Sequence, residues 1–225
     1  MVNHVLTPAR SLAAYVGAFL MTYIESSAFE KEDPFVIALP LIVLTVLALM
    51  TPMRPQTRLM TAISFMIYSI ALSGSSSTHS SVTMICILSV VANLAYFSSF
   101  SCLIEVWSYP AVCLSVLIFV LVFLQIFSDL IVAIPLLVIL LSASFASAMF
   151  LFTAALSICL NGNHGEFDAK EASGIRVLGT MSNCLSQFFF LLYAFSHHST
   201  STHFYSKITF YASQILLYLS NERTF

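Results

Sequence analysis

The chain has 225 residues, of which 8% are Asp, Glu, Lys or Arg and 59% are hydrophobic. About a quarter of the residues of a soluble domain are charged, because charged side chains cover its surface. The composition therefore excludes a soluble enzyme and a disordered chain. The eight Lys and Arg residues form no cluster that could neutralise a phosphate backbone, so nucleic acid is excluded as a partner.

Long stretches without charge predict an all-α fold of eight membrane-spanning helices in a single domain, residues 1–225. Helices are favoured over barrel strands because the apolar runs are continuous and do not alternate. Seven spans are the alternative. The expected spans are, in chain order, residues 10–24, 35–50, 58–73, 82–97, 110–127, 134–160, 174–196 and 207–219.

The segment around the sixth span is the hardest to divide. Residues 130–160 are too many for one untilted span and include Pro135, which predicts a kinked helix or a short re-entrant piece followed by a helix. The polar residues 161–173 are expected to form the next loop. Trp107 and Tyr109 are candidate interfacial anchors at the start of the fifth span.

The basic residues predict the orientation of the chain in the membrane. With eight spans, Lys31 and Lys207 fall on one side and the other six basic residues on the opposite side, which places both termini in the cytoplasm. These six basic residues are Arg10, Arg54, Arg58, Lys170, Arg176 and Arg223.

The length of the spans predicts the membrane. Several spans are short, which suits the endoplasmic reticulum, whose hydrocarbon layer is about 27 Å thick.

Polar residues near or inside the spans are the candidates for chemistry. Glu105 is expected in a loop, Asp129 as a helix cap, and Asp33 with its acidic neighbours in a solvated loop. Amides inside spans usually form hydrogen bonds between helices. The amides inside the spans are Asn93, Gln125, Asn183, Gln187 and Gln214. For two of them, Asn93 and Gln187, contact with a substrate is the more specific hypothesis.

No metal or cofactor is expected. The histidines at 197, 198 and 203 fall in a Ser/Thr-rich loop without neighbouring Cys or carboxylate, and His79 and His164 are isolated. The five cysteines have no C-x-x-C spacing and are expected to be packing residues. The sequence contains no conventional hydrolase or nucleotide-binding signature.

Residues 58–69, 93–96, 178–187 and 209–216 form four stretches that resemble segments of the lysoplasmalogenase-like family of eight-span membrane proteins. Residues 58–69 are similar to a family segment that begins with Arg and ends in Gly-Asp. In the fourth span, Asn93 and Tyr96 fall where the family has His followed three residues later by Tyr. Residues 178–187 resemble its Gly-x-x-x-F-x-x-Ser-Asp stretch. Residues 209–216, TFYASQIL, match its closing Thr-Tyr-Tyr-x-x-Gln-x-Leu and include Gln214.

The resemblance implies hydrolysis of the vinyl ether bond of lysoplasmalogens, but the chain departs from the family at the ionisable positions. The Gly-Asp of the family aligns with Tyr68 and Ser69, its His with Asn93, and its Ser-Asp with Ser186 and Gln187. The reaction needs an acid to protonate the alkene and a base to activate water. Hydroxyl and amide groups do neither near neutral pH.

Two explanations compete for this departure. The favoured one is a divergent homologue that binds membrane lipids, for example a lysophospholipid, but has lost hydrolysis. In the second, activity persists through Asp129, Glu105 or His79. A small-molecule transporter or channel is the alternative from another class, and a purely structural membrane protein is a third. The cavity is expected to involve Tyr68, Tyr96, Ser186 and Gln214 beside the three replaced positions.

Overall fold

The computed structural model describes residues 8–31, 33–74, 80–128, 130–131, 134–162, 167–195 and 200–224. Within these ranges the chain forms eight α-helices with short 3-10 and π-helical turns, and no β-strand. The prediction of an all-α fold is confirmed. The helices are α1 (Pro8–Glu25), α2 (Pro34–Met50), α3 (Pro55–Ser73), α4 (Ser80–Phe100), α5 (Tyr109–Val122), α6 (Pro135–Asn161), α7 (Phe167–Phe195) and α8 (Thr200–Thr224).

Prolines mark where many of these helices begin. Pro8, Pro34, Pro55 and Pro135 are first residues of helices, a position that needs no backbone N–H donor. The kink expected at Pro135 is therefore wrong, because α6 starts at this residue and runs on for 27 residues. Residues 132 and 133, where a re-entrant piece would lie, are outside the described residues.

The last two helices are longer than their apolar segments. The loop expected over 161–173 is wrong, because α6 includes Asn161 and α7 already begins at Phe167. The first turns of α7 contain Ala, Lys and Glu, which favour a helix whether or not they lie in lipid. Asp33 is likewise more than a loop residue, since its side chain accepts a hydrogen bond from the N–H of Phe35 and caps α2.

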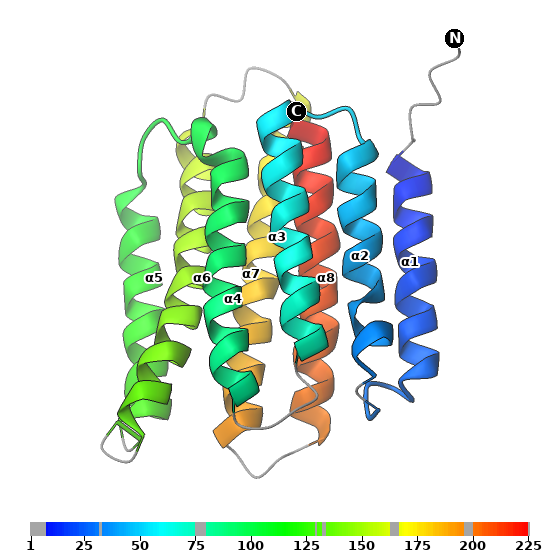
Figure 1. Cartoon of the computed structure of the whole chain (residues 1–225). Coiled ribbons are helices and arrows are strands. Elements are labelled where there is room, and N and C mark those ends of the chain that lie inside the picture. Colours follow the sequence, from blue (N-terminus) through cyan, green and yellow to red (C-terminus); the bar gives the residue numbers. More distant parts are fainter. Residues whose placement is uncertain are drawn as a thin grey trace.

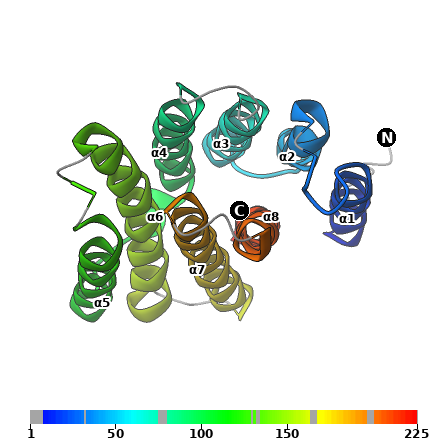
Figure 2. The ribbon, with the colours of Figure 1, turned by 90° about the horizontal axis from the view of Figure 1, so that it is seen from below.

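The helices run side by side and their directions alternate along the chain (Figure 1). Viewed from below, α1 to α4 form a curved row, and α6, α7 and α8 lie against the inside of this row (Figure 2). Among the described elements, α7 and α8 make the most extensive pairing, and α5 packs mainly on α6 at one edge. This arrangement places α8 against α7 and against α1, α2 and α3 of the row.

The alternating directions place six basic residues at one end of the bundle, the upper end in Figure 1. We call it the basic end. It also holds the turn from α4 to α5 with Glu105 and Trp107. Lys31 and Lys207 belong to the opposite half, which we call the basic-poor half. The six residues at the basic end are Arg10, Arg54, Arg58, Lys170, Arg176 and Arg223.

Among the described residues, four helical segments are long and apolar enough to cross a membrane, which indicates a membrane protein. They are Val82–Leu103, Tyr109–Phe127, Pro135–Asn161 and Lys170–Phe195, and Pro34–Met50 is a shorter apolar helix. The segment Tyr109–Phe127 ends in a π-helical turn, Phe123–Phe127, and most of its side chains face outward. Such outward apolar surface is expected of a helix solvated by lipid.

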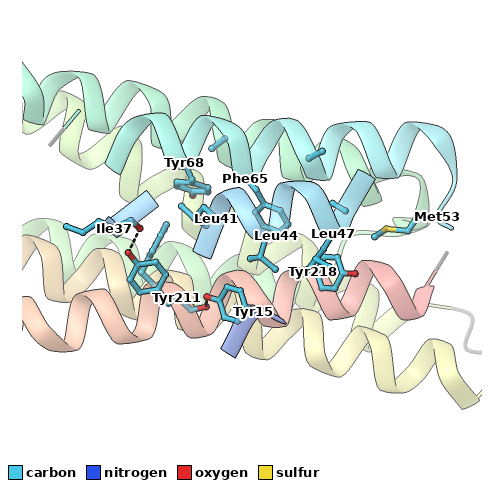
Figure 3. Close-up of a cluster of buried hydrophobic side chains, with 14 of the residues drawn as sticks. Tyr15, Ile37, Leu41, Leu44, Leu47, Met53, Phe65, Tyr68, Tyr211 and Tyr218 are labelled. Atoms are coloured by element: carbon cyan, nitrogen blue, oxygen red, sulfur yellow. Dashed lines mark hydrogen bonds between the residues drawn. The ribbon is translucent and has the colours of Figure 1, made fainter. Parts of the chain in front are cut away.

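Hydroxyl groups of α1 and α8 donate hydrogen bonds to backbone carbonyls of α2. Pro40 inside α2 has no N–H to bond the carbonyl oxygen of Val36, and the hydroxyl of Thr22 in α1 donates to this oxygen over 2.8 Å. Tyr211 of α8 donates to the carbonyl oxygen of Ile37 over 2.6 Å, as drawn in Figure 3. These bonds join α1, α2 and α8 around a buried hydrophobic cluster (Figure 3).

Candidate functional site

A cavity of about 780 Å³ lies between α3, α4, α6, α7 and α8 and reaches the loop after α1. Its volume falls within the usual range of small-molecule pockets. Most of its walls are apolar or aromatic. They include Ala71, Leu72, Val82, Ile85, Phe190, Phe204 and Phe210.

The lining residues all come from the basic-poor half of the bundle. Ser89 and Ser144 lie nine residues along their helices from Ser80 and Pro135, and Gln187 lies eight residues before the end of α7 at Phe195. At a rise of ~1.5 Å per residue, these three residues are about 13 Å inside the bundle. We call Ser89, Ser144 and Gln187 the floor of the cavity.

The floor carries neutral hydrogen-bonding groups. The hydroxyl of Ser144 donates to the side-chain oxygen of Gln187 over 3.4 Å. Within the described part of the chain, neither the hydroxyl of Ser89 nor the amide nitrogen of Gln187 has a hydrogen-bond partner, although both residues line the cavity. The floor therefore offers unused donors to a molecule inside the cavity.

A buried polar network lies next to the floor. Tyr68, which also lines the cavity, donates its hydroxyl to the side-chain oxygen of Asn93 over 2.6 Å. The amide nitrogen of Asn93 donates to Ser147 over 2.8 Å, and Asn183 donates to Asn93 over 3.2 Å. Asn93 thus joins α3, α6 and α7 to α4, as expected for an amide between packed helices.

The mouth of the cavity is bordered by the loop that follows α1. Three consecutive residues of this loop, Ser27, Ala28 and Phe29, have φ between 50° and 68°, in the left-handed region that favours glycine. Phe29 is fully buried, and its ring lies 5.7 Å from that of Tyr211 and 6.3 Å from that of Phe204. Aromatic packing therefore holds a strained loop at the entrance.

Among the described residues, the Glu, His and Lys side chains that line the mouth are Glu30, His203 and Lys207. His203 was expected in a loop but lies on α8, where its ring is 4.8 Å from the ring of Tyr193. Reciprocal hydrogen bonds between Ser186 and Ser206 place the backbone of Lys207 level with the floor. Side chains in a helix lean toward its N-terminus, and for α8 this direction leads to the mouth.

The candidate positions separate into two groups. Tyr68, Ser186 and Gln187 line the cavity, and Asn93 is bonded directly to Tyr68. Ser69 is buried, but its hydroxyl bonds the carbonyl of Met66 in its own helix. Two further candidates, Tyr96 and Gln214, are also fully buried and are not among the residues that line this cavity.

Tyr96 belongs to a second polar cluster, near the basic end. Its hydroxyl bonds the carbonyl of Leu217 and the hydroxyl of Ser220. The guanidinium of Arg176, only 1% exposed, donates to Asn221 over 3.2 Å and to Thr224 over 2.9 Å. The last turn of α8, with its free carbonyl groups, is thus where this buried cation is stabilised. The sequence showed Arg176 only as one of the basic residues, because nothing local indicates burial.

None of the ionisable candidates that the structure describes belongs to the floor. Glu105 is exposed in the turn between α4 and α5. No group of three or more potential metal ligands occurs among the residues that the structure describes. None of the five cysteines forms a disulfide, and Cys86 lines the cavity. Asp129 and the histidines at 79, 164, 197 and 198 lie outside the described residues.

Chemically, the floor can bind and orient a polar group but offers no general acid or base. Its side chains are two hydroxyls and an amide, which neither release nor take up a proton near neutral pH. Ser89 and Ser144 were not among the sequence candidates, since serines are common throughout these helices. Comparison of the chain with known protein families, curated proteins and solved structures gave no match.

Proposed function

We propose that the protein is an eight-span membrane protein that binds a single-chain membrane lipid in this cavity and does not hydrolyse it. The observation that supports this proposal is the cavity itself, which has apolar walls and a neutral floor that contains Gln187. Gln187 is a position where the resemblance to lysoplasmalogenases implies a carboxylate. A lysophospholipid is the ligand that this resemblance implies, and the neutral floor supports binding without turnover.

The first test measures catalysis. Purified protein in detergent is incubated with a lysoplasmalogen and assayed for release of fatty aldehyde, with a characterised lysoplasmalogenase as positive control. We expect no release above the detergent blank. Turnover that persists after Asp129, Glu105 and His79 are replaced would contradict both the loss of hydrolysis and its alternative, a site built from those three residues.

The second test measures binding. Native mass spectrometry of the detergent-solubilised protein is recorded with oleoyl lipids that differ only in head group. We expect one lipid per chain to bind saturably and Ala71→Phe, which fills the cavity, to abolish binding. Ala212→Phe, on the outward face of α8, is the control and is expected to bind normally. Equal binding by both variants would place the lipid elsewhere and refute the proposal.

We further propose that both termini are cytoplasmic and that the membrane is the endoplasmic reticulum. The proposal is supported by the six basic residues at one end of the bundle. Cys102 lies exposed near that end, after α4. In sealed microsomes, a variant that keeps only Cys102 is expected to react with an impermeant maleimide added outside. Reaction only after permeabilisation would reverse the orientation.

Transport of a small molecule is the alternative function. It predicts uptake of solute into proteoliposomes, which lipid binding alone does not. Pro40 supplies the kind of helix interruption that transporters use, but its freed carbonyl is bonded by Thr22 and α2 continues through it. We therefore favour lipid binding.

A further inference from the structure

We infer that the ligand of the cavity is a single-chain lipid with an uncharged oxygen head group, such as a hydroxyl or a glycerol ester, and that this group lies on the floor. The inference rests on the proposed function, because it assumes that a lipid occupies the cavity. It goes further by specifying the head group and the direction in which the lipid is inserted.

The first argument is the set of unused donors. Ser144 already donates to the oxygen of Gln187, which leaves the amide nitrogen of Gln187 and the hydroxyl of Ser89 facing the cavity without a partner among the described residues. If the Gln187 amide were turned round, one polar atom of that side chain would still be unpaired. A ligand oxygen, which accepts hydrogen bonds, would pair with these donors, whereas the methyl end of a chain would leave them unsatisfied.

The second argument is charge. Burial of a phosphate about 13 Å inside the bundle is strongly unfavourable unless a cation pairs with it. Among the described residues that line the cavity, the only Lys or Arg is Lys207, whose side chain leans from floor level toward the mouth. The floor itself contributes no cation from the described residues. An uncharged head group avoids the cost and still uses the donors.

The third argument is the distribution of apolar surface. Between the floor and the mouth, the cavity is walled by apolar side chains from α3, α4, α7 and α8, among them Leu72, Val82, Phe190 and Phe204. A single alkyl chain that leads outward from the floor would lie against these walls. The polar end and the chain of the ligand are therefore matched by separate parts of one cavity.

Equilibrium binding of three oleoyl lipids tests the inference: monooleoylglycerol, oleoyl lysophosphatidylcholine and oleoyl lysophosphatidate. We expect monooleoylglycerol to bind at least tenfold more tightly than either phospholipid. Gln187→Leu keeps the size of the side chain and removes the amide, and should weaken binding of monooleoylglycerol about tenfold, or ~1.4 kcal/mol. Gln125→Leu, at an exposed glutamine of the π-helical turn, is the matched control and should change nothing.

The outcomes separate the inference from the proposed function. Binding of lysophosphatidate as tight as that of monooleoylglycerol, abolished by Lys207→Met, would overturn the inference but keep a lipid in the cavity. Equal affinity of Gln187→Leu and the wild type for monooleoylglycerol would overturn the position of the head group. If Gln187→Leu does not fold, Ser89→Ala replaces it, with a loss of about threefold or more expected. Absence of binding by all three lipids would refute the inference and the proposed function together.

Discussion

Of the glycines compared, Gly179 in α7 has the closest neighbouring atoms, and these belong to α8. Its replacement by alanine tests how tightly the two helices pack. A Cβ atom at this position would lie 2.9 Å from Cδ2 of Leu217 and 3.1 Å from Cβ of Leu216. The leucine methyl can rotate away, but Cβ of Leu216 is fixed to the backbone of α8. The two helices must therefore separate by a few tenths of an ångström.

The expected magnitude is the difference of two effects. Overpacking of a buried contact costs about 1–3 kcal/mol, whereas replacing glycine by alanine inside a helix gains up to ~1 kcal/mol. We expect Gly179→Ala to lower the free energy of unfolding by about 1 kcal/mol. Gly174 lies in the same helix, and a Cβ atom there would meet no neighbouring atom within 4 Å. Gly174→Ala should therefore only gain the stabilisation of alanine over glycine in a helix.

The assay is unfolding by sodium dodecyl sulfate in mixed micelles, followed by far-ultraviolet circular dichroism. The quantity compared is the difference in free energy of unfolding between the two variants. Both replace glycine by alanine in the same helix, and both are measured in the same micelles. We expect Gly179→Ala to be less stable than Gly174→Ala by about 1–3 kcal/mol. Equal stability of the two would show that α7 and α8 are not in close contact at this level, and the close packing of Gly179 on α8 would be refuted.

Three further changes test separate parts of the bundle by the same unfolding assay. Arg176→Lys keeps the charge but not the guanidinium fork, and should cost about 2 kcal/mol; wild-type stability would argue against these bonds. Ala28→Gly should stabilise the protein by about 1 kcal/mol, because φ is positive there, whereas Ala212→Gly inside α8 should destabilise it by a similar amount. If both substitutions lower the free energy of unfolding, the left-handed conformation at Ala28 is excluded. Asn93→Leu removes three hydrogen bonds between helices and should cost about 2 kcal/mol; a neutral result would mean that the network contributes nothing.

Local composition was sufficient to predict most of the helices. Uncharged runs located all eight, and a residue such as Pro34 or Pro55 defines a helix start because it needs no N–H donor. The start of α7 and both ends of α8 were placed too far inside, since charge marks the limit of an apolar segment but does not stop a helix. The error at Pro135 has the same origin, because the same residue kinks a helix in its interior and begins one at its edge.

The site depends on which helices are neighbours, and this is not a local property. The sequence proposed Gln187 and Asn93 as polar positions, yet their partners Ser144 and Ser147 come from α6, and the bonds form only because α6 lies between α4 and α7. Burial of Arg176 depends in the same way on the last turn of α8.

The sequence by itself predicted a membrane protein, because a chain with so few charged residues cannot cover a soluble surface. It also predicted an all-helical fold, because the apolar runs are continuous and do not alternate as barrel strands do. Only the tertiary structure decided where its polar groups meet. A hydroxyl or an amide has the same chemistry anywhere along a span, and its role follows from whether another helix satisfies it or a cavity leaves it open. At Asn93 neighbouring helices satisfy the amide, and at Gln187 part of the amide remains open to the cavity.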